Sequence, residues 1–486
     1  MKIGRKFGWW VGGCVVGLAA VLGALAFLFF HTFYPSARKA DYPQAHDLTT
    51  AQRQDLDYFQ HYFTLNRAYS PEALTQAKGL YHEAQANAGT YSAAAFDLLI
   101  MRMAALSDNG HSKVFTGPLS RRNNRIPCRL YRFADGYYVI RAQPACEALL
   151  GAKLLAVDGM PVDDLVDRMY AYTLGPRNHY DQSVTPFFLE SPDLLHAAGL
   201  AGEANRLSLR VQLPDGNEHD VMMFADPPDA TAPRLFSDSY LSPRRIDGES
   251  ADWAPLLPSN AALPQFLRDY DTPFHTDWWP EKSTYYVQFR SNKDEPGHPI
   301  RPFIERVERE VAAHSPRFIV LDLRLDQGGD FTTTASLMKR IATLTDSIQH
   351  VYVLTSAWTF SAGNISLALV KEHGGDKVSV LGDPVGDRVR IWAEGGDLQL
   401  PNSKLRIGYA TGYHDYSKPC WGERGCFWVV LFFPTHVTSF DPDVRVPFTF
   451  EDYVHLRDPV LEKAFVLAGK LDQVDSTKDK PNALHQ

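Results

Sequence analysis

Ser361 stands where a hydroxyl group could act as a nucleophile. The segment Val351–Val370, VYVLTSAWTFSAGNISLALV, predicts a strand, a short turn and an amphipathic helix that begins at Ser361. A hydroxyl there lies beside unpaired backbone N–H groups and the positive end of the helix dipole, which stabilise a developing oxyanion. Serine is also a preferred helix N-cap, so this position alone does not establish catalysis.

Two glycines after a predicted buried strand could supply backbone hydrogen-bond donors. The segment Leu321–Asp330, LDLRLDQGGD, runs out of the strand into Gly328 and Gly329 before the next helix. Glycine allows close approach of the backbone, so either amide could face a substrate carbonyl. An ordinary left-handed turn would have the same sequence.

His111 is the candidate for proton transfer. It lies in LSDNGHSKV, residues 106–114, directly after a predicted helix and a turn-forming Asp-Asn-Gly. Imidazole titrates near neutral pH and is the commonest general base. A lone histidine is nevertheless more often structural than catalytic, so His111 needs support from its surroundings.

These residues depend on an α/β layer that the sequence predicts from Thr284 onward. The strands YYVQF, FIVLDLRL, HVYVLTS and VSVLGD alternate with helices at residues 299–315, 332–345 and 361–375. Continuous apolar strands separated by helices indicate a sheet that is covered on both faces.

The rest of the chain divides by composition and periodicity. Apolar residues recur at helical spacing from Thr49 to Leu106, and short alternating runs between Cys128 and Met223 predict a small β-rich domain with one or two helices. A proline- and tryptophan-rich stretch then predicts a connector without long regular elements. The expected organisation is residues 1–35 as a membrane anchor, 45–120 helical, 121–226 β-rich, 227–280 connector, 281–470 α/β core and 471–486 polar tail.

Four of the five cysteines form two pairs that are close in sequence, Cys128 with Cys146 and Cys420 with Cys426. In an oxidising compartment such pairs indicate disulfides, whereas in the cytosol they would more often bind metal or act in catalysis. No CxxC, HExxH or zinc-spaced His/Cys quartet occurs, so the sequence predicts neither a metal nor a cofactor. The absence of GxSxG around Ser361 disfavours the α/β-hydrolases.

The N-terminus predicts an uncleaved membrane anchor. Trp9–Phe30 is an uncharged apolar run of 22 residues, and about 20 are needed to cross a bilayer as a helix. Lys2, Arg5 and Lys6 precede it, which by the positive-inside rule places the N-terminus in the cytoplasm and the chain after Phe30 across the membrane. A cleaved signal peptide is the alternative, but its apolar run is usually shorter and ends in small residues.

Composition excludes several classes of protein. The 486 residues are 45% hydrophobic and 22% charged, as in a globular chain and not as in a disordered, collagen-like or polytopic membrane protein. The net charge of −8, with no basic run after residue 40, gives no basis for nucleic-acid binding.

The three candidate stretches, in this order, resemble the C-terminal processing (tail-specific) serine proteases and the related tricorn core. FIVLDLRLDQGGD is similar to that family's Asp-Leu-Arg strand with a Gly-Gly pair, and TFSAGNISLALVKEHGGDKVSVLGDPVG is similar to its nucleophile segment. LSDNGHSKV resembles its Asp-Gly-His stretch, GAKLLAVDGMPVDDL the turn of its PDZ-like domain, and FDPDVRVPFTFEDYVHLRDPVLEKA its closing segment. The resemblance covers about residues 95–468.

The resemblance implies roles for individual residues. It places the nucleophile at Ser361 and oxyanion donors on the amides of Ala362 and of Gly328 or Gly329. The better-known branch carries a lysine base where this chain has Asp387, and aspartate cannot replace a desolvated lysine in that role. The tricorn-like branch implies His111 as base, within hydrogen-bond reach of Ser361 or within about 5 Å in a looser free state, and a third, orienting acid. We predict Asp415 as that acid, with Asp383 and Asp108 as rivals.

The resemblance implies a PDZ-like β domain and a crotonase-like α/β spiral core. With the N-terminal membrane anchor and the small helical layer that the sequence pattern predicts, the expected protein is mixed α/β. The expected function is that of a single-pass inner-membrane serine peptidase with its bulk in the periplasm, which cleaves unfolded or C-terminal peptide segments. Two alternatives stay open: a non-catalytic ligand- or peptide-binding protein on the same fold, and a membrane scaffold.

Overall fold

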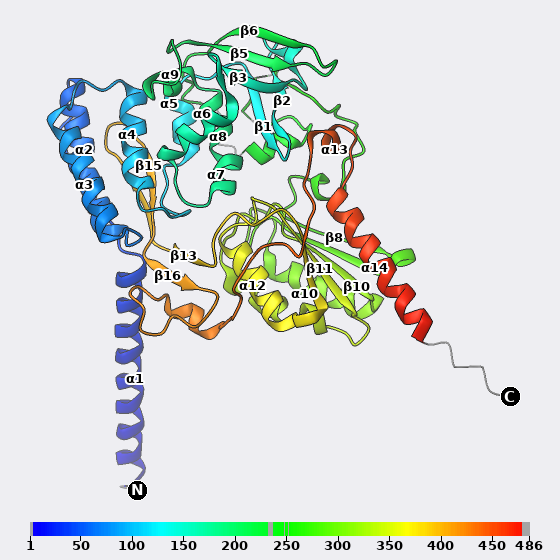
Figure 1. The fold of residues 1–486 in the computed structure, drawn as a ribbon. Helices are drawn as coiled ribbons and strands as arrows, with labels where there is room; N and C mark the ends of the chain where they lie inside the picture. Colours follow the sequence, from blue (N-terminus) through cyan, green and yellow to red (C-terminus); the bar gives the residue numbers. More distant parts are fainter. Residues whose placement is uncertain (1–2, 232–236, 247, 251, 479–486) are drawn as a thin grey trace.

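Apolar runs in the C-terminal half form a six-stranded sheet in the order β17-β12-β11-β10-β9-β8 (Figure 1). The structure is a computed structural model that describes residues 3–231, 237–246, 248–250 and 252–478. The five strands from β9 to β17 are parallel, and β8 runs antiparallel to β9. Their bounds are β8 Phe274–Trp279, β9 Thr284–Phe289, β10 Phe318–Asp322, β11 His350–Thr355, β12 Val378–Gly382 and β17 Val444–Arg445. All residues of β9 and β10 are buried, as expected for strands covered on both faces.

Helices cover both faces of this sheet. Three helices share one apolar core with the sheet: α10 (Ile300–His314), α11 (Phe331–Arg340) and α12 (Ala362–Gly374). The C-terminal helix α14 (Pro459–Lys478) packs against the other face through Val460, Leu461 and Ala464. It includes the first residues of the expected polar tail, of which residues 479–486 lie outside the described part.

The expected β-rich region forms a seven-stranded sheet, with β1-β2-β3-β5-β6 in order, β4 paired to β3 and β7 paired to β2. Its strands are β1 Cys128–Phe133, β2 Gly136–Ala142, β3 Lys153–Val157, β4 Met160–Pro161, β5 Arg206–Gln212, β6 Glu218–Phe224 and β7 Ala254–Pro255. The helices α6 (Val162–Met169), α7 (Arg177–Ser183), α8 (Thr185–Leu189) and α9 (Pro192–Ala197) lie within the same stretch of chain. The strand β7 comes from the expected connector, which also supplies β8.

The N-terminal helical layer consists of α2 (Leu48–Leu65), α3 (Pro71–Ala86) and α4 (Ala93–Ala105), followed by the short helix α5 (Thr116–Arg122). Asp47, Ser70 and Ser92 cap the first three helices with side-chain hydrogen bonds, which explains where each begins. Two hairpin-like sheets join this layer to the core, β13 (Arg390–Ala393) with β16 (Gly412–Asp415) and β14 (Gly396–Gln399) with β15 (Arg406–Tyr409). A further short helix, α13 (Phe450–Val454), precedes α14.

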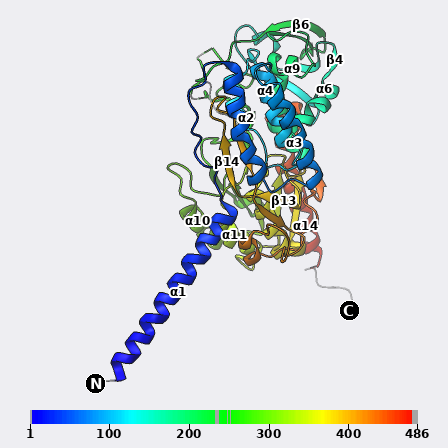
Figure 2. The same cartoon turned by 90° about the vertical axis from the view of Figure 1, so that its left-hand side faces the viewer.

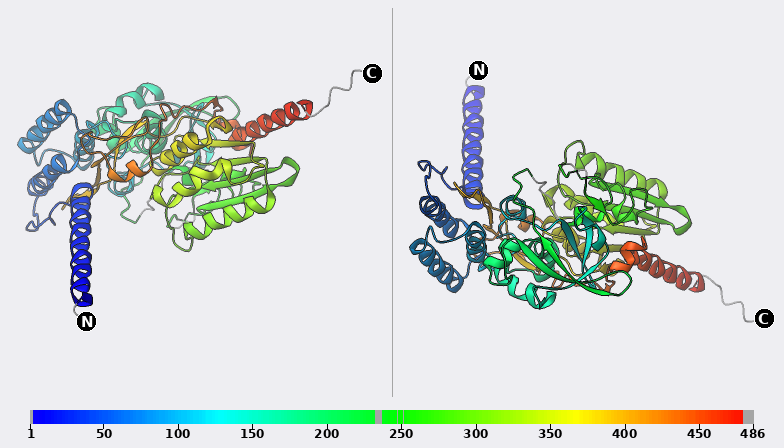
Figure 3. Two further views of the ribbon diagram at one scale, coloured as in Figure 1. Left: turned by 90° about the horizontal axis from the view of Figure 1, so that it is seen from below. Right: turned by 90° about the horizontal axis from the view of Figure 1, so that it is seen from above.

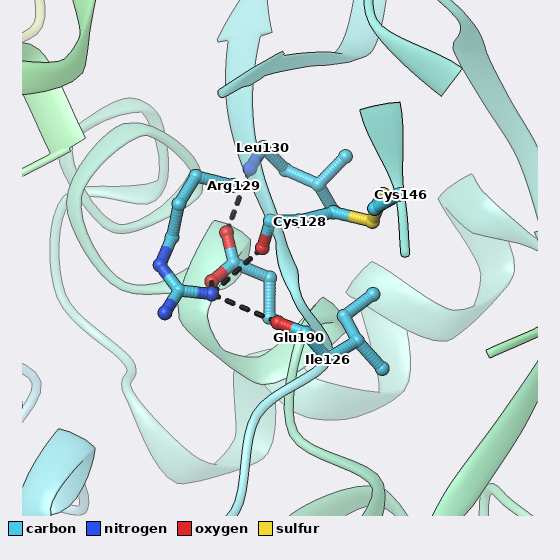
Figure 4. The surroundings of a disulfide bond; sticks show 6 residues. All are labelled: Ile126, Cys128, Arg129, Leu130, Cys146 and Glu190. Atoms are coloured by element: carbon cyan, nitrogen blue, oxygen red, sulfur yellow. Dashed lines mark hydrogen bonds and ion pairs between the residues drawn. A yellow bond between two sulfur atoms is a disulfide. The ribbon is translucent and has the colours of Figure 1, made fainter. Parts of the chain in front are cut away.

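Both predicted disulfides are confirmed. Cys128 and Cys146 have Cα atoms 5.8 Å apart, and those of Cys420 and Cys426 are 5.5 Å apart. The first joins the start of β1 to the chain after β2. Beside it the carboxylate of Glu190 accepts a hydrogen bond from the Leu130 amide at 2.7 Å and lies 3.5 Å from the Arg129 guanidinium, so the start of β1 is held from two sides (Figure 4).

The N-terminal segment is a helix, α1 (Ile3–Phe33), that projects from the body (Figure 2). It and α14 leave the body on different sides (Figure 3). Within the part of the chain whose side chains are described, which begins at residue 17, we find no helix with the length and apolar character needed to span a bilayer. The expected anchor at Trp9–Phe30 therefore lies partly outside the described side chains.

Candidate active site

Ser361 occupies the turn between β11 and α12 in a conformation that few residues other than glycine adopt. Its φ and ψ are 54° and −119°, and α12 begins at the next residue. The side chain makes no capping hydrogen bond, and its hydroxyl has no hydrogen-bond partner among the described residues. Local backbone strain of this kind persists where the surrounding structure enforces it and clusters at functional sites. The hydroxyl is thus held at a helix N-terminus without being used to cap the helix.

The predicted glycine loop lies directly against Ser361. A Cβ atom on Gly328 would lie 2.6 Å from the Ser361 Cβ and 3.0 Å from the Ala362 amide nitrogen, so only glycine fits there. The Gly328 amide, however, donates to the Asp326 carboxylate at 3.0 Å. Ala362 is the first residue of α12, so its amide has no acceptor within the helix. Of the predicted oxyanion donors, Gly328 is thus already engaged.

A buried network that sequence reasoning missed holds this loop. The Asn292 side-chain amide donates to both Asp326 carboxylate oxygens, at 2.6 and 2.7 Å. Its carbonyl oxygen accepts from Thr334 of α11 at 2.8 Å and from Ser366 of α12 at 3.0 Å. Burial raises the pKa of Asp326 to about 7. The network ties the glycine loop to the two helices that flank it.

His111 reaches the Ser361 turn from the N-terminal layer, although 250 residues separate the two in sequence. Its ring stacks on Phe360, the residue before Ser361, with centroids 4.6 Å apart. Its Nδ1 lies 3.5 Å from a carboxylate oxygen of Asp387. Neither ring nitrogen has a hydrogen-bond partner among the described residues, so the predicted bond to Ser361 is absent in this arrangement.

Burial sets the protonation of the His111–Asp387 pair. It lowers the pKa of His111 to about 3, with further contributions from Lys113 and His414. It also raises the pKa of Asp387 to about 7. The imidazole is therefore neutral over the physiological range, which is the form that a general base requires.

The structure brings a different carboxylate to His111 from the one we predicted. Asp415 ends β16, where it accepts from the Ser417 amide at 2.9 Å and pairs with Arg390 at 3.2 Å. Its rivals are also engaged elsewhere, Asp108 with Arg388 at 2.9 Å and Asp383 with Arg445 at 3.8 Å. The sequence analysis considered Asp387 only as the residue that replaces a lysine base. An acid at that position was a usable signal for the orienting carboxylate, and it was missed.

Phe360 separates His111 from a second histidine that the sequence did not indicate. The His179 ring of α7 stacks on Phe360 with centroids 4.3 Å apart. Its Nδ1 donates to the Ala357 carbonyl at 3.1 Å, and its Nε2 accepts from the Lys113 ammonium at 3.0 Å. Burial lowers the pKa of Lys113 to about 8. Because both ring nitrogens of His179 are engaged, it is a poorer base than His111.

A cavity of about 360 Å³ opens beside the same turn. It lies between β1 and α7 of the β-rich region and the carboxyl ends of β11 and β12, where open α/β sheets bind ligands. Aromatic and arginine side chains dominate its wall, among them Arg132, Phe133, Arg177, Trp358, Arg445 and Phe448. The described residues contain no group of three or more His, Cys, Asp or Glu side chains able to hold a metal ion.

Comparison with solved structures identifies the fold. The chain is similar to mature CPAF, with 13% identity and a TM-score of 0.54 over 88% of this chain and 98% of that chain. It is also similar to the photosystem II D1 C-terminal processing protease (11% identity, 82% and 93% covered, TM-score 0.36). A third neighbour is the tricorn protease (14% identity, 87% and 37% covered, TM-score 0.36). No protein-family model matches the sequence, and no curated protein matches it either.

The likeness to CPAF shows a common mixed α/β fold, and at this identity it shows no more. The neighbours include the two kinds of protease that the motif resemblance named. The roles of Ser361, His111, Asp415 and the oxyanion donors stay predictions.

Proposed function

We propose that the protein is a serine peptidase in which Ser361 is the nucleophile. The observation that carries this proposal is the strained turn at Ser361, where the hydroxyl makes no capping hydrogen bond and the Cβ packs against Gly328. A strand, a sharp turn and a helix are the means by which several hydrolase folds present a serine. The fold neighbours that bear protease names support the same class of reaction.

The proposed reaction is acyl transfer from a peptide bond to the Ser361 oxygen. His111 accepts the hydroxyl proton and returns it to the leaving amine, and water then hydrolyses the acyl-enzyme with the same base. Asp387 accepts from the second ring nitrogen and stabilises the imidazolium. The Ala362 amide, with Gly329, would donate to the oxyanion. Phe360 must turn aside for His111 to meet Ser361, which makes the described arrangement a resting one.

Labelling with a fluorophosphonate probe tests the nucleophile. We expect the wild-type chain to be labelled and to cleave an unstructured peptide, and Ser361→Ala to lose both. The matched control is Ser336→Ala, because Ser336 is exposed on α11 and bonds only within its own helix turn. Labelling of Ser361→Ala at the wild-type level, with its thermal unfolding unchanged, would overturn the assignment.

A non-catalytic peptide-binding protein is the second candidate. It is favoured by the Phe360 ring that covers His111 and by the Gly328 amide that is already bonded to Asp326. Under this alternative the wild-type chain is not labelled and shows no turnover. Peptide binding at the cavity between the two sheets would then be the same in Ser361→Ala as in the wild type.

We also propose that α1 anchors the chain in the inner membrane with the remainder in the periplasm. The described part of α1 presents large apolar side chains to its surroundings in several directions, including Leu18, Val21, Leu22, Leu25, Phe27, Leu28 and Phe30. Two disulfides suit an oxidising compartment.

The β-rich region at residues 121–226 would act as a PDZ-like domain that captures a peptide end as an added strand.

The membrane proposal is checked by alkaline washing of membranes and by thiol titration. The chain should stay in the washed membranes, and the unfolded, non-reduced protein should contain one reactive thiol, Cys14. Three or more reactive thiols, or release by the wash, would contradict the topology.

A further inference from the structure

A run of six apolar residues, Trp428–Val429–Val430–Leu431–Phe432–Phe433, lies at the surface of the folded chain. Trp428, Val429, Val430 and Phe433 pack partly against the core of the α/β layer, whereas Phe432 is exposed. The first five form a short 3-10 helix, η8 (Trp428–Phe432), in which no residue is buried, and Phe433 is half-buried. Phe432 is 76% exposed. Single exposed apolar residues are ordinary, but an exposed aromatic ring at the tip of a partly buried apolar run, next to other exposed apolar side chains, is a candidate contact surface. We refer to residues 428–433 as the WVVLFF segment.

The WVVLFF segment lies at the base of α1. Phe33 of α1 packs against Phe427 and Trp428, with ring centroids 5.0 and 5.4 Å apart, and Phe29 packs against Trp428 at 5.9 Å. At this end α1 meets the body, and the rest of the helix projects away from it (Figures 1 and 2). The segment therefore adjoins the last turns of α1, where Phe30 is 60% exposed.

The neighbouring charge suits the edge of a bilayer. The Lys339 ammonium lies 4.5 Å from the centre of the Phe433 ring and donates to the Phe432 carbonyl at 3.5 Å. A lysine beside exposed aromatic rings is typical of the headgroup level, where aromatic side chains gather and basic residues meet anionic lipids. A residue that packs beside the end of a membrane-spanning helix is necessarily at that level.

We propose that the WVVLFF segment inserts into the interfacial layer of the bilayer that α1 spans, giving the protein a second membrane contact. A single helix would let the body rotate and tilt, whereas two contacts fix which face of the α/β core lies against the lipid. The inference rests on the membrane anchoring proposed above and is independent of peptidase activity. The bilayer is preferred to a second copy of the chain because the segment adjoins α1.

Depth-dependent fluorescence quenching of the full-length chain tests this contact. In a Cys14→Ser background, Phe432→Cys is labelled with bimane and the protein is placed in vesicles of phosphatidylcholine and phosphatidylglycerol, with and without acyl-chain bromine. Phe224→Cys is the matched control, because Phe224 is an exposed aromatic residue, 59% accessible, on β6 at the end of the body far from α1 (Figure 1). Brominated lipid should remove about half of the fluorescence at position 432, since interfacial segments reach the acyl boundary, and none at position 224.

The outcomes separate this contact from the anchoring on which it rests. Absence of quenching at position 432 in a chain that resists the alkaline wash overturns the inference and leaves the anchoring intact. Release by the wash overturns both. Crosslinking of two copies of the unlabelled Phe432→Cys chain by a short bis-maleimide, in a protein that shows no quenching when labelled, would assign the segment to self-association and also overturn the inference. Peptide cleavage by the labelled protein reports separately on the proposed enzyme.

Discussion

The two walls of the candidate site are held in different ways. The wall that carries Ser361 is fixed by hydrogen bonds: the Phe360 amide donates to the Asp326 carbonyl at 2.9 Å, and the Thr359 hydroxyl donates to the Leu323 carbonyl at 2.8 Å. In the other wall the backbone is also bonded, for example through the Ser112 hydroxyl that donates to Asn66 at 2.9 Å, but the His111 imidazole itself is held by its stack on Phe360 and its 3.5 Å approach to Asp387 and makes no hydrogen bond among the described residues. The first wall is built to hold a strained residue, whereas the second can move its base with little loss of bonding.

This difference indicates how a resting site could become active. An imidazole held by ring stacking and by its approach to Asp387 can change rotamer when a substrate displaces Phe360, and no buried hydrogen bond of the ring has to break. The serine wall does not need to rearrange, because the network of Asn292 and Asp326 has already set its backbone.

The largest expected effect is that of His111→Gln. Removal of the base of a serine triad lowers turnover by about 10⁶ in a well-studied protease. The matched control is His179→Gln, which alters the other ring stacked on Phe360, and there we expect a loss of less than about tenfold because His179 is not the base. Peptide cleavage measures both. An equal loss in the two variants would show that the stack around Phe360, and not a specific base, is what matters.

The next largest effect distinguishes Asp387 from Asp415 as the acid that orients His111. Asp387→Asn should lower turnover by about 10⁴, as loss of the orienting acid does in the triad proteases. Asp415→Asn should leave turnover within about tenfold and lower the free energy of unfolding by about 1–2 kcal/mol, through lost hydrogen bonds to Ser417 and the pair with Arg390. Kinetics and denaturant unfolding distinguish the two. A catalytic loss confined to Asp415→Asn would restore Asp415 as the third residue.

The pH dependence follows from the same pair. The pKa of His111 is lowered to about 3 and that of Asp387 is raised to about 7, so the pair holds one proton between those values and loses it above about 7. Since the base form needs neutral His111 and ionised Asp387, kcat/KM should rise with pH through a midpoint near 7. That midpoint should disappear in Asp387→Asn.

Stability should change in the opposite sense. Folding raises the pKa of Asp387 from 3.8 to about 7, so its contribution to the free energy of unfolding is fully present below about pH 4 and is lost as pH rises through 7. Burial also raises the pKa of Asp326 to about 7, but Asp326 is present in both the wild type and Asp387→Asn. The difference between their free energies of unfolding, measured against pH, therefore reports on Asp387. A stability difference that does not depend on pH would show that Asp387 is ionised throughout.

The sequence predicts the serine wall better than the histidine wall, for a physical reason. The strand, turn and helix around Ser361 follow from local periodicity, and the helix starts within one residue of its predicted start. The Asn292–Asp326 contact had a usable signal that was missed, since both residues follow parallel strands whose carboxyl ends meet at one edge of the sheet. No sequence signal pointed to His179, because its place beside Phe360 depends on how the β-rich region docks on the core. Asp387 needed the same docking to be assigned to His111.

The smallest effect on turnover is expected from the disulfides, which lie in the β-rich region (Cys128–Cys146) and after β16 (Cys420–Cys426). The entropy that a disulfide removes from the unfolded chain grows only slowly with loop length, so removal of either bridge should lower the free energy of unfolding by about 2–3 kcal/mol. The loss should be somewhat larger for Cys128–Cys146, which are 18 residues apart, than for Cys420–Cys426, which are 6 apart. If Asp415 were the third catalytic residue, the Cys420–Cys426 loop beside it would stiffen a catalytic wall. Because Asp387 is the acid beside His111, the paired change Cys420→Ser and Cys426→Ser should lower the denaturant midpoint and leave kcat/KM near the wild-type value. A large loss of kcat/KM at full folding would mean that the β16 region acts on the base, most directly through His414, whose charge lowers the pKa of His111.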